Sequence, residues 1–463
     1  MLTRLRYKLQ EIRSSFWFVP AGFVLGAVVL ATVLITVDAS FDLQVAERWP
    51  LLFGAGAAGA RGLLTAVAGS MITVAGVVFS ITLVALSLTS SQYTSRVIRN
   101  FMRDRGTQSV LGVFVGIFAY CLVVLRTIRA GDEVEFVPSL AVLAGLLLAF
   151  VGIAFLIYFI HHISVSIQAS SIVAATAQET IAAVDHLYPV ALGDEDDEEA
   201  DGDLATSLEN QSWFAVPARK TGYIETIDAD ALLALARKHG GILRMERGIG
   251  EFVVEGAPLV SIADPDGRDG WVGETAAALN AVYVVSRHRT VEQDAAFGIR
   301  QIVDIALKAL SPGINDTTTA VMCVDYLGAI LSRLAARRIA TPHWLDQGEL
   351  RVMARGPSFE SLLDEAFDQI RQNAAGNVAV LSRTVGALQV VSGQTPSPSR
   401  RRAVQEKVQW VADLAERTIA SPHDRARFVN RLARARKTLE IGPVVPPPEK
   451  PPGAGRENLW REP

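Results

Sequence analysis

The sequence contains a long stretch without any charge. No lysine, arginine, aspartate, glutamate or histidine occurs in the 34 residues 62–95, and further uncharged stretches cover residues 14–37, 106–125 and 136–160. A soluble core helix does not need so long an apolar run, whereas a helix that crosses a bilayer needs about 20 apolar residues. The absence of charge therefore excludes a wholly soluble protein. It predicts four transmembrane helices, at about residues 14–37, 64–90, 106–126 and 137–160.

Cysteine and histidine are also scarce. The two cysteines, Cys121 and Cys323, show no sign of pairing, and the seven histidines are scattered without the spacing of a metal site. The chain lacks a G-x-S-x-G sequence, a phosphate-binding G-x-x-x-x-G-K-[ST] loop and an H-E-x-x-H motif. We therefore expect no enzyme, no cofactor and no bound metal. A net charge of −4 disfavours a nucleic-acid binder.

The basic residues that flank the apolar stretches predict the orientation. Short loops on the cytoplasmic side carry more lysine and arginine than loops on the outer side. Eight basic residues fall on one side and four on the other: Arg4, Arg6, Lys8, Arg13, Arg96, Arg99, Arg103 and Arg105 against Arg48, Arg61, Arg126 and Arg129. Both termini of this multi-pass membrane protein are thus expected in the cytoplasm. The first apolar stretch is longer than that of a signal peptide, so we expect it to be retained.

Hydroxyl side chains recur along the second predicted span. Alternating steps of three and four residues place one set of positions on a single face of a helix: Ser70, Thr73, Val77, Ser80, Val84, Ser87 and Ser91. Such a face can line a water-filled path, with Val77 and Val84 as constrictions and Arg96, Arg99 and Arg103 at the cytosolic mouth. It can equally allow helices to pack closely and form hydrogen bonds across their contact. The predicted spans contain no ionisable group, which disfavours a coupled transporter.

Small residues and histidines mark two further features of the membrane part. The pairs Gly22/Gly26 and Gly112/Gly116 have the G-x-x-x-G spacing that permits close contact between helices. The pair His161–His162 follows the last span, and an anchor at the membrane surface is the simplest interpretation.

The second half of the chain predicts a cytosolic α+β part. A helical extension and an acidic linker cover residues 163–212, and the linker contains Asp-Glu-Asp-Asp-Glu-Glu at 194–199 with Asp201 and Asp203. Short glycine-bounded strands around a helical insert at 229–239 predict a small β module, similar to a barrel-sandwich hybrid, at 213–265. A helical domain is expected at 266–440 and a disordered proline-rich tail at 441–463. Residues 1–162 form the predicted transmembrane domain.

A dense polar set lies inside the predicted helical domain. Its members are charged or can cap a helix: Arg289, Glu292, Asp294, Arg300, Asp304, Asn315 and Asp316. One interpretation is a ligand or ion site at a helix start. The other is a group of salt bridges and caps that joins helices.

Two sequence stretches resemble a known family. The string from Arg289 to Asp316 (RTVEQDAAFGIRQIVDIALKALSPGIND) and the string from Phe79 to Gln92 (FSITLVALSLTSSQ) are similar to bacterial predicted membrane proteins catalogued as domain of unknown function 2254. The family usually has proline after the Asn-Asp pair, where this chain has Thr317. The resemblance implies an inner-membrane helical part and a cytosolic part, but no activity.

These observations favour a homo-oligomeric ion channel whose pore is lined by the second span and whose cytosolic domain regulates or assembles it. The alternative is a membrane-anchored scaffold or sensor that binds a ligand or protein without permeation. The expected partners are membrane lipid, other copies of the chain, and ions or a small cytosolic ligand.

Overall fold

The computed structural model describes residues 17–40, 56–92, 104–129, 136–190, 212–263, 274–339, 343–346 and 349–441. The chain divides into two compact units, Met1–Ile172 and Val173–Pro463. Several predictions lie outside the described residues: the mouth residues Arg96, Arg99 and Arg103, the acidic run and the proline-rich tail.

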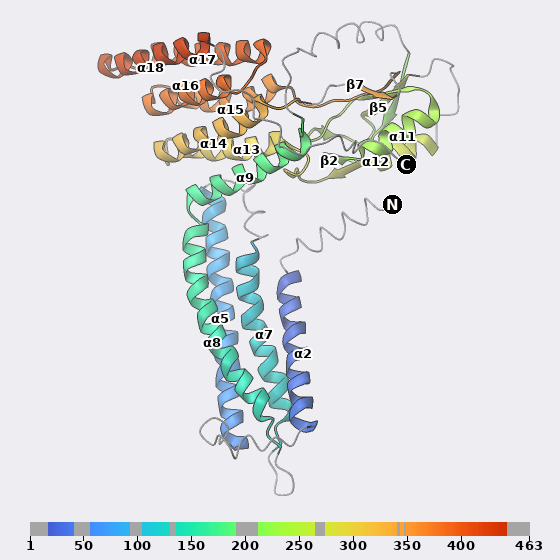
Figure 1. Ribbon diagram of the computed structural model, residues 1–463, viewed down its shortest axis with the longest axis vertical. Coiled ribbons are helices and arrows are strands. Elements are labelled where there is room, and N and C mark those ends of the chain that lie inside the picture. Colours follow the sequence, from blue (N-terminus) through green and yellow to red (C-terminus); the bar gives the residue numbers. More distant parts are fainter. Residues whose placement is uncertain are drawn as a thin grey trace, which may run out of the picture. The chain divides into compact units, whose positions relative to one another are not determined.

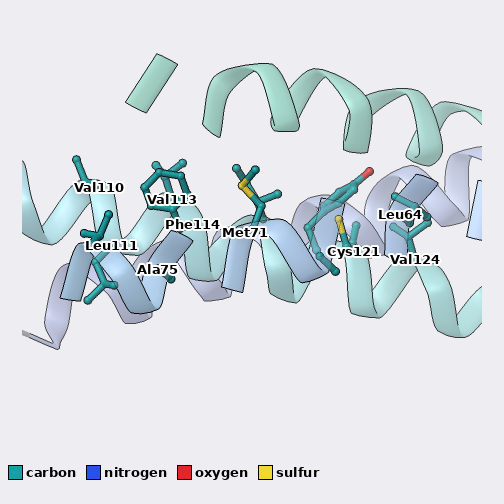
Figure 2. Close-up of a cluster of buried hydrophobic side chains, with 14 of the residues drawn as sticks. Leu64, Met71, Ala75, Val110, Leu111, Val113, Phe114, Cys121 and Val124 are labelled. Atoms are coloured by element: carbon teal, nitrogen blue, oxygen red, sulfur yellow. The ribbon is translucent and has the colours of Figure 1, made fainter. Parts of the chain in front are cut away.

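Four apolar helices build the first unit: α2 (Phe18–Ser40), α5 (Ala57–Gln92), α7 (Arg105–Thr127) and α8 (Ser139–Ser166). Figure 1 shows them side by side as a bundle. Helix α7 packs against the other three and is the most buried, because apolar or small residues occupy nearly its whole circumference. Its side chains from Val110 to Val124 interdigitate with those of α5 from Leu64 to Ala75 (Figure 2).

Glycines allow the helices of this bundle to approach closely. A Cβ atom added at Gly112 would lie 2.6 Å from the Phe23 ring, and one added at Gly116 would lie 3.3 Å from the backbone oxygen of Phe23. Gly112/Gly116 is therefore a helix contact within the unit. In contrast, Gly22 and Gly26 face open space in the described chain.

Polar contacts of the bundle are concentrated at helix ends. Asp38, near the end of α2, accepts hydrogen bonds from the first backbone N–H groups of α8, at 3.3 Å from Leu140 and 3.2 Å from Ala141. Arg61 donates to the carbonyl of Ile128, directly after α7, at 2.7 Å. Such contacts satisfy groups that a helix leaves unbonded at its termini. Helices α2 and α8 extend beyond the predicted spans and so contain Asp38 and His162, which corrects the expectation of spans without ionisable groups.

Nine helices of the second unit are described. They are α9 (Ala169–Leu187), α11 (Ala229–His239), α12 (Glu274–Val282), α13 (Ala295–Leu310), α14 (Thr317–Ala335), α15 (Phe359–Asn373), α16 (Val378–Gly393), α17 (Pro398–Thr418) and α18 (Pro422–Ile441). The last six stack against one another (Figure 1), and short loops join them except between α14 and α15, where residues 336–358 intervene.

Helix α14 is a fifth helix long and apolar enough to cross a membrane. It is packed among α13, α15 and α16, and Gly328 lets the side chain of Ala387 come close. Its Asp325 pairs with Arg383, and its Arg333 pairs with Asp185. These contacts make α14 a core helix of the second unit.

Two sheets complete the second unit. The larger has the order β1 (Trp213–Pro217), β5 (Pro258–Ala263), β3 (Ile242–Met245), β8 (Glu349–Met353) and β7 (His343–Asp346). The smaller has the order β4 (Phe252–Val253), β2 (Gly222–Ile227) and β6 (Tyr283–Ser286).

The sheets differ from the predicted β module in their extent. Strands β1 to β5 and the helical insert α11 lie within residues 213–265, but β6, β7 and β8 come from the stretch expected to be helical. The register shows the connection directly, because Leu243 of β3 pairs in parallel with Val352 of β8. Residues far apart in the sequence thus share one sheet.

Candidate functional site

Helix α5 has two different faces. The face toward its own bundle is buried and repeats at steps of three and four residues: Leu64, Ala68, Met71, Ala75, Val78, Thr82, Ala85 and Thr89. Each hydroxyl-stripe residue follows one of these by two positions, which turns it about 200° around the helix. Accordingly Ser70, Thr73, Val77, Ser80, Val84 and Ser87 are all exposed, with Val77 at 52% and Val84 at 56%. The side chain of Ser91 lies outside the description.

Three hydroxyls of this stripe have no side-chain hydrogen bond within the described part of the chain. Buried Thr82 and Thr89 each donate to the carbonyl four residues earlier, at 2.8 Å, and exposed Thr73 does the same. Ser70, Ser80 and Ser87, however, form no hydrogen bond with any residue that the structure describes. In an apolar solvent, a hydroxyl lowers its free energy when it forms a hydrogen bond with any available partner. The three serines are therefore free to bind water or another helix.

A row of glycines lies beside the stripe. Gly62, Gly69 and Gly76 repeat every seven residues, and a Cβ atom added at any of them meets nothing within 4 Å. This face of α5 therefore has only small side chains over about two turns on each side of Ser70, and the described chain does not cover it there.

The polar set of the second unit divides into three separate groups. In the first, Asp294 caps α13 through the backbone N–H of Phe297, and Arg289 donates two hydrogen bonds to its carboxylate, at 2.8 and 3.0 Å. Asp294 is buried, and the guanidinium of Arg289 lies over the Phe297 ring. This group fixes the start of α13.

The second group joins two helices. Arg300 lies 3.0 Å from Asp304 on α13, and it reaches Glu365 and Gln369 on α15 at 3.1 Å each. The guanidinium of Arg300 is thus bound by acceptors on two helices, α13 and α15.

The third group caps α14. Asp316 accepts hydrogen bonds from the backbone N–H and the hydroxyl of Thr319, at 3.0 and 2.5 Å. The Thr319 hydroxyl bond and the backbone bonds lower the pKa of Asp316, against a smaller effect of burial. Asn315 before it has a left-handed backbone (φ 49°), which asparagine tolerates well. Asn315 and Glu292 are exposed, and the hydrogen bonds and ion pairs given above for the other five residues lie within these three groups.

Two other polar groups were not predicted. Asp185 of α9 pairs with Arg333 at 2.6 Å and with Arg337 at 2.7 Å, and the hydrogen bond from Arg333 is the main cause of its lowered pKa. In the first unit, His162 lies 2.6 Å from Asp104, which also caps α7. The histidine was expected as an anchor, but its partner is 58 residues away in sequence, and no local spacing indicates the pair.

The described residues contain no group of three or more histidine, cysteine or acidic side chains that could hold a metal ion. Cys121 and Cys323 are free and buried. Burial raises the pKa of the Cys323 thiol to about 12, with a further contribution from Asp316, which makes it a poor nucleophile.

Comparison with known proteins identifies the family. The sequence model of the family described as predicted membrane protein (DUF2254) matches residues 13–390. The chain belongs to this family. DUF2254 relatives include an uncharacterized protein of Mycobacterium tuberculosis (strain ATCC 25618 / H37Rv) and one of Mycobacterium bovis (strain ATCC BAA-935 / AF2122/97). Each is 34% identical over 97% of this chain and 85% of its own length. No solved structure gives a significant match.

Membership in DUF2254 explains the apolar bundle of the first unit as the membrane part of a predicted membrane protein. The matched residues include the α5 stripe and the polar groups of α13 and α14, and they end within α16.

Proposed function

We propose that the chain is the subunit of a homo-oligomeric ion channel in the bacterial inner membrane, with four spans per subunit and a pore lined by α5. The observation that supports this most is the uncovered hydroxyl stripe. Ser70, Ser80 and Ser87 lie on the face of α5 that points away from its own bundle, and no described residue bonds them.

The surroundings of this stripe argue for water rather than lipid. Hydroxyls on other exposed faces of the bundle donate to their own helix, as Thr32 does to Val28 and Ser164 to Ile160. Large exposed apolar residues of α5, among them Phe79, Ile81 and Leu83, lie on either side of the stripe and can face lipid or another helix, as Leu147 and Phe150 of α8 can, so only the narrow stripe itself would face water. A path that holds water needs hydroxyls and an apolar constriction but no buried charge. Val77 and Val84 supply apolar rings in this arrangement.

Four spans fit the packing better than five. Helix α14 has partners within the second unit for Asp325 and Arg333 and buries its apolar face there, so it gains nothing from a bilayer. With an even number of spans, both termini lie on one side, which the basic loops assign to the cytoplasm. The mouth residues Arg96, Arg99 and Arg103 then follow the cytosolic end of α5.

The second unit fits a regulatory or assembly domain better than an enzyme. Its polar groups pair with one another and cap helices, and the hydroxyl of Thr275, which lies 3.5 Å from Nε2 of His239, belongs to a buried side chain. The β strands and the hairpin stack supply surfaces through which copies can associate.

Thiol chemistry tests the channel. Ser80→Cys and Ser87→Cys should react with a charged water-soluble methanethiosulfonate reagent in reconstituted vesicles, and the reaction should reduce ion flux. Two controls are Leu147→Cys, on the lipid-facing side of α8, and Ala75→Cys, on the buried face of α5. Neither should react. If Ser80→Cys and Ser87→Cys are as unreactive as Leu147→Cys in folded protein, the channel proposal fails, and a membrane-anchored scaffold or sensor is the function that remains.

A further inference from the structure

The last two described helices carry an excess of positive charge. Residues 398–441, which include α17 and α18, contain eleven lysine and arginine residues but only five aspartate and glutamate residues, although the net charge of the whole chain is −4. Basic residues gathered in one part of an otherwise acidic chain indicate contact with an anionic surface. Which of them can make such a contact depends on where the fold places them.

Five of these basic residues are held by the fold, namely Arg400, Lys407, Arg425, Arg431 and Arg436. Arg400 and Lys407 are buried. The guanidinium of Arg431 lies against α16, because a Cβ atom added at Gly386 would lie 2.6 Å from it. Arg425 and Arg436 donate to neutral acceptors, the carbonyl of Ile419 at 2.7 Å and the amide oxygen of Gln409 at 2.6 Å. These five side chains therefore have contacts within the second unit.

The outer face of α18 carries the remaining basic residues of that helix. Phe428, Leu432 and Ala435 are buried and define the inner side. At about 100° per residue, Arg427, Arg434 and Lys437 point about 100° to 180° away from that side. Small neutral side chains lie beside them, and we call the whole exposed set the outer basic face of α18: Ala426, Arg427, Asn430, Ala433, Arg434 and Lys437.

The described carboxylates do not neutralise two of these charges. Arg427 and Lys437 form no hydrogen bond or ion pair with any described residue. Arg434 donates to the backbone carbonyl of Asn430 in its own helix at 3.3 Å. Neither Arg427 nor Lys437 pairs with the exposed acidic residues of neighbouring α17, which are Glu406, Asp413 and Glu416. Both side chains can therefore bind an anion from outside the second unit.

A membrane is the anionic surface to which this chain is attached. The chain belongs to a family of predicted membrane proteins and contains helices apolar enough to cross a bilayer, so its second unit is tethered to one. The tether gives lipid headgroups a high effective concentration at the second unit. The cytoplasmic leaflet carries anionic lipids, and each lysine or arginine near it strengthens association by roughly fivefold. A soluble nucleic acid has no such tether, and the acidic remainder of the chain repels it.

From these observations we infer that the outer basic face of α18 binds the phosphate headgroups of anionic lipids. The contact is electrostatic, because the large apolar residues Phe428 and Leu432 are buried in the fold, and it is therefore screened by salt. It does not depend on permeation, and it lies on a helix beyond the residues that the family model matches.

A fluorescent probe on this face tests the inference. Ala433→Cys can be labelled selectively, because both native cysteines are buried. The labelled full chain is reconstituted into vesicles that contain a lipid with a nitroxide quencher on its headgroup. Quenching at position 433 should be at least about twofold stronger in vesicles with one third phosphatidylglycerol than in phosphatidylcholine alone, and 0.5 M salt should remove the difference. A probe at Ala379→Cys, exposed on α16, should be quenched equally in both. Equal quenching at position 433 in the two kinds of vesicle would overturn the inference.

Variants identify the side chains that carry the contact. Arg427→Gln combined with Lys437→Gln should reduce the extra quenching severalfold. Lys220→Gln combined with Lys238→Gln removes the same charge from exposed positions in the first half of the second unit and should leave the quenching unchanged. Thermal unfolding of each variant shows whether α18 remains folded, and Arg427→Lys, which keeps the charge, should retain the contact. If added RNA but not anionic lipid changes the fluorescence at position 433, the face binds nucleic acid and the lipid inference is wrong.

Discussion

Asp294 accepts hydrogen bonds both from the backbone at the start of α13 and from the guanidinium of Arg289. Gly250 completes the environment, because its left-handed backbone (φ 81°) passes so near that a Cβ atom would lie 2.4 Å from the carboxylate. One buried carboxylate thus holds a helix, a loop and an arginine in place.

We expect Asp294→Ala to lower the free energy of unfolding by about 2 to 3 kcal/mol, since it removes a helix cap and leaves a half-buried guanidinium without its partner. Urea unfolding of the full chain in detergent measures this change. Glu255→Gln, at an exposed carboxylate, should change the value by less than about 0.5 kcal/mol. Similar values for the two variants would show that Asp294 has no structural role.

The cap at Asp316 should depend on pH. Its pKa is lower in the folded protein than the value of about 3.9 for an unfolded aspartate, so its stabilisation is fully present above that value. It is lost as the pH falls through the folded-state pKa. The difference in unfolding free energy between wild type and Asp316→Ala should therefore shrink below about pH 4. The matched variant Ser358→Ala, which removes a neutral cap from α15, should show a difference that does not change with pH.

Between elements, a close contact of the second unit lies where α9 meets α13. A Cβ atom added at Gly298 would lie 2.1 Å from the hydroxyl oxygen of Thr180 and 2.8 Å from its methyl carbon. Next to this crossing, Asp185 of α9 pairs with two arginines at the end of α14. Helix α9 is thus tied to α13 and α14 by shape and by charge.

Gly298→Ala should cost about 1 to 3 kcal/mol of stability, because the two helices must separate to admit the methyl group. Thermal unfolding of Gly298→Ala measures this cost. The control is Gly313→Ala, because a Cβ atom added at Gly313 meets nothing within 4 Å. The prediction is contradicted if both variants unfold at the wild-type temperature.

Elements with a long sequence pattern can be predicted from the sequence, whereas short elements cannot. The four long apolar helices and the insert at 229–239 follow from uncharged runs and glycine boundaries, and the structure contains helices at all five places. Strands β7 and β8 could not be predicted, because four or five residues such as His343–Asp346 carry no clear alternation. They are strands only because β8 pairs with β3 and β7 pairs with β8. The length of α14 likewise suggests a span until its partners are known.

The candidate sites were predictable to different degrees for the same reason. The α5 stripe is a repeat within one helix, so the sequence reveals which residues share a face. The caps at Asp294 and Asp316 are local contacts, and the sequence allows caps as one of two interpretations of the polar set. The pairing of Arg300 with Glu365, of Asp185 with Arg333 and of Asp104 with His162 joins residues at least 58 positions apart, which only the fold determines.

For the molecule as a whole, the proposed pore makes Val84 a residue that opposes permeation. Replacing it with serine adds a hydroxyl where the path is most apolar, so Val84→Ser should increase single-channel conductance or opening in planar bilayers. Leu147→Ser, at an exposed position of α8, should leave both unchanged. Equal currents from the two variants at equal protein density would argue that α5 does not line the path.

The burial of both native thiols has a practical consequence. Cys121 and Cys323 each have 0% of their surface exposed, one within the apolar bundle and one in the core of the second unit. Polar alkylating agents should therefore leave the wild-type chain unmodified while it stays folded. Fluorophores or spin probes can then be attached at single introduced sites without first removing the natural cysteines, and the packing around those two sulfur atoms remains that of the native protein.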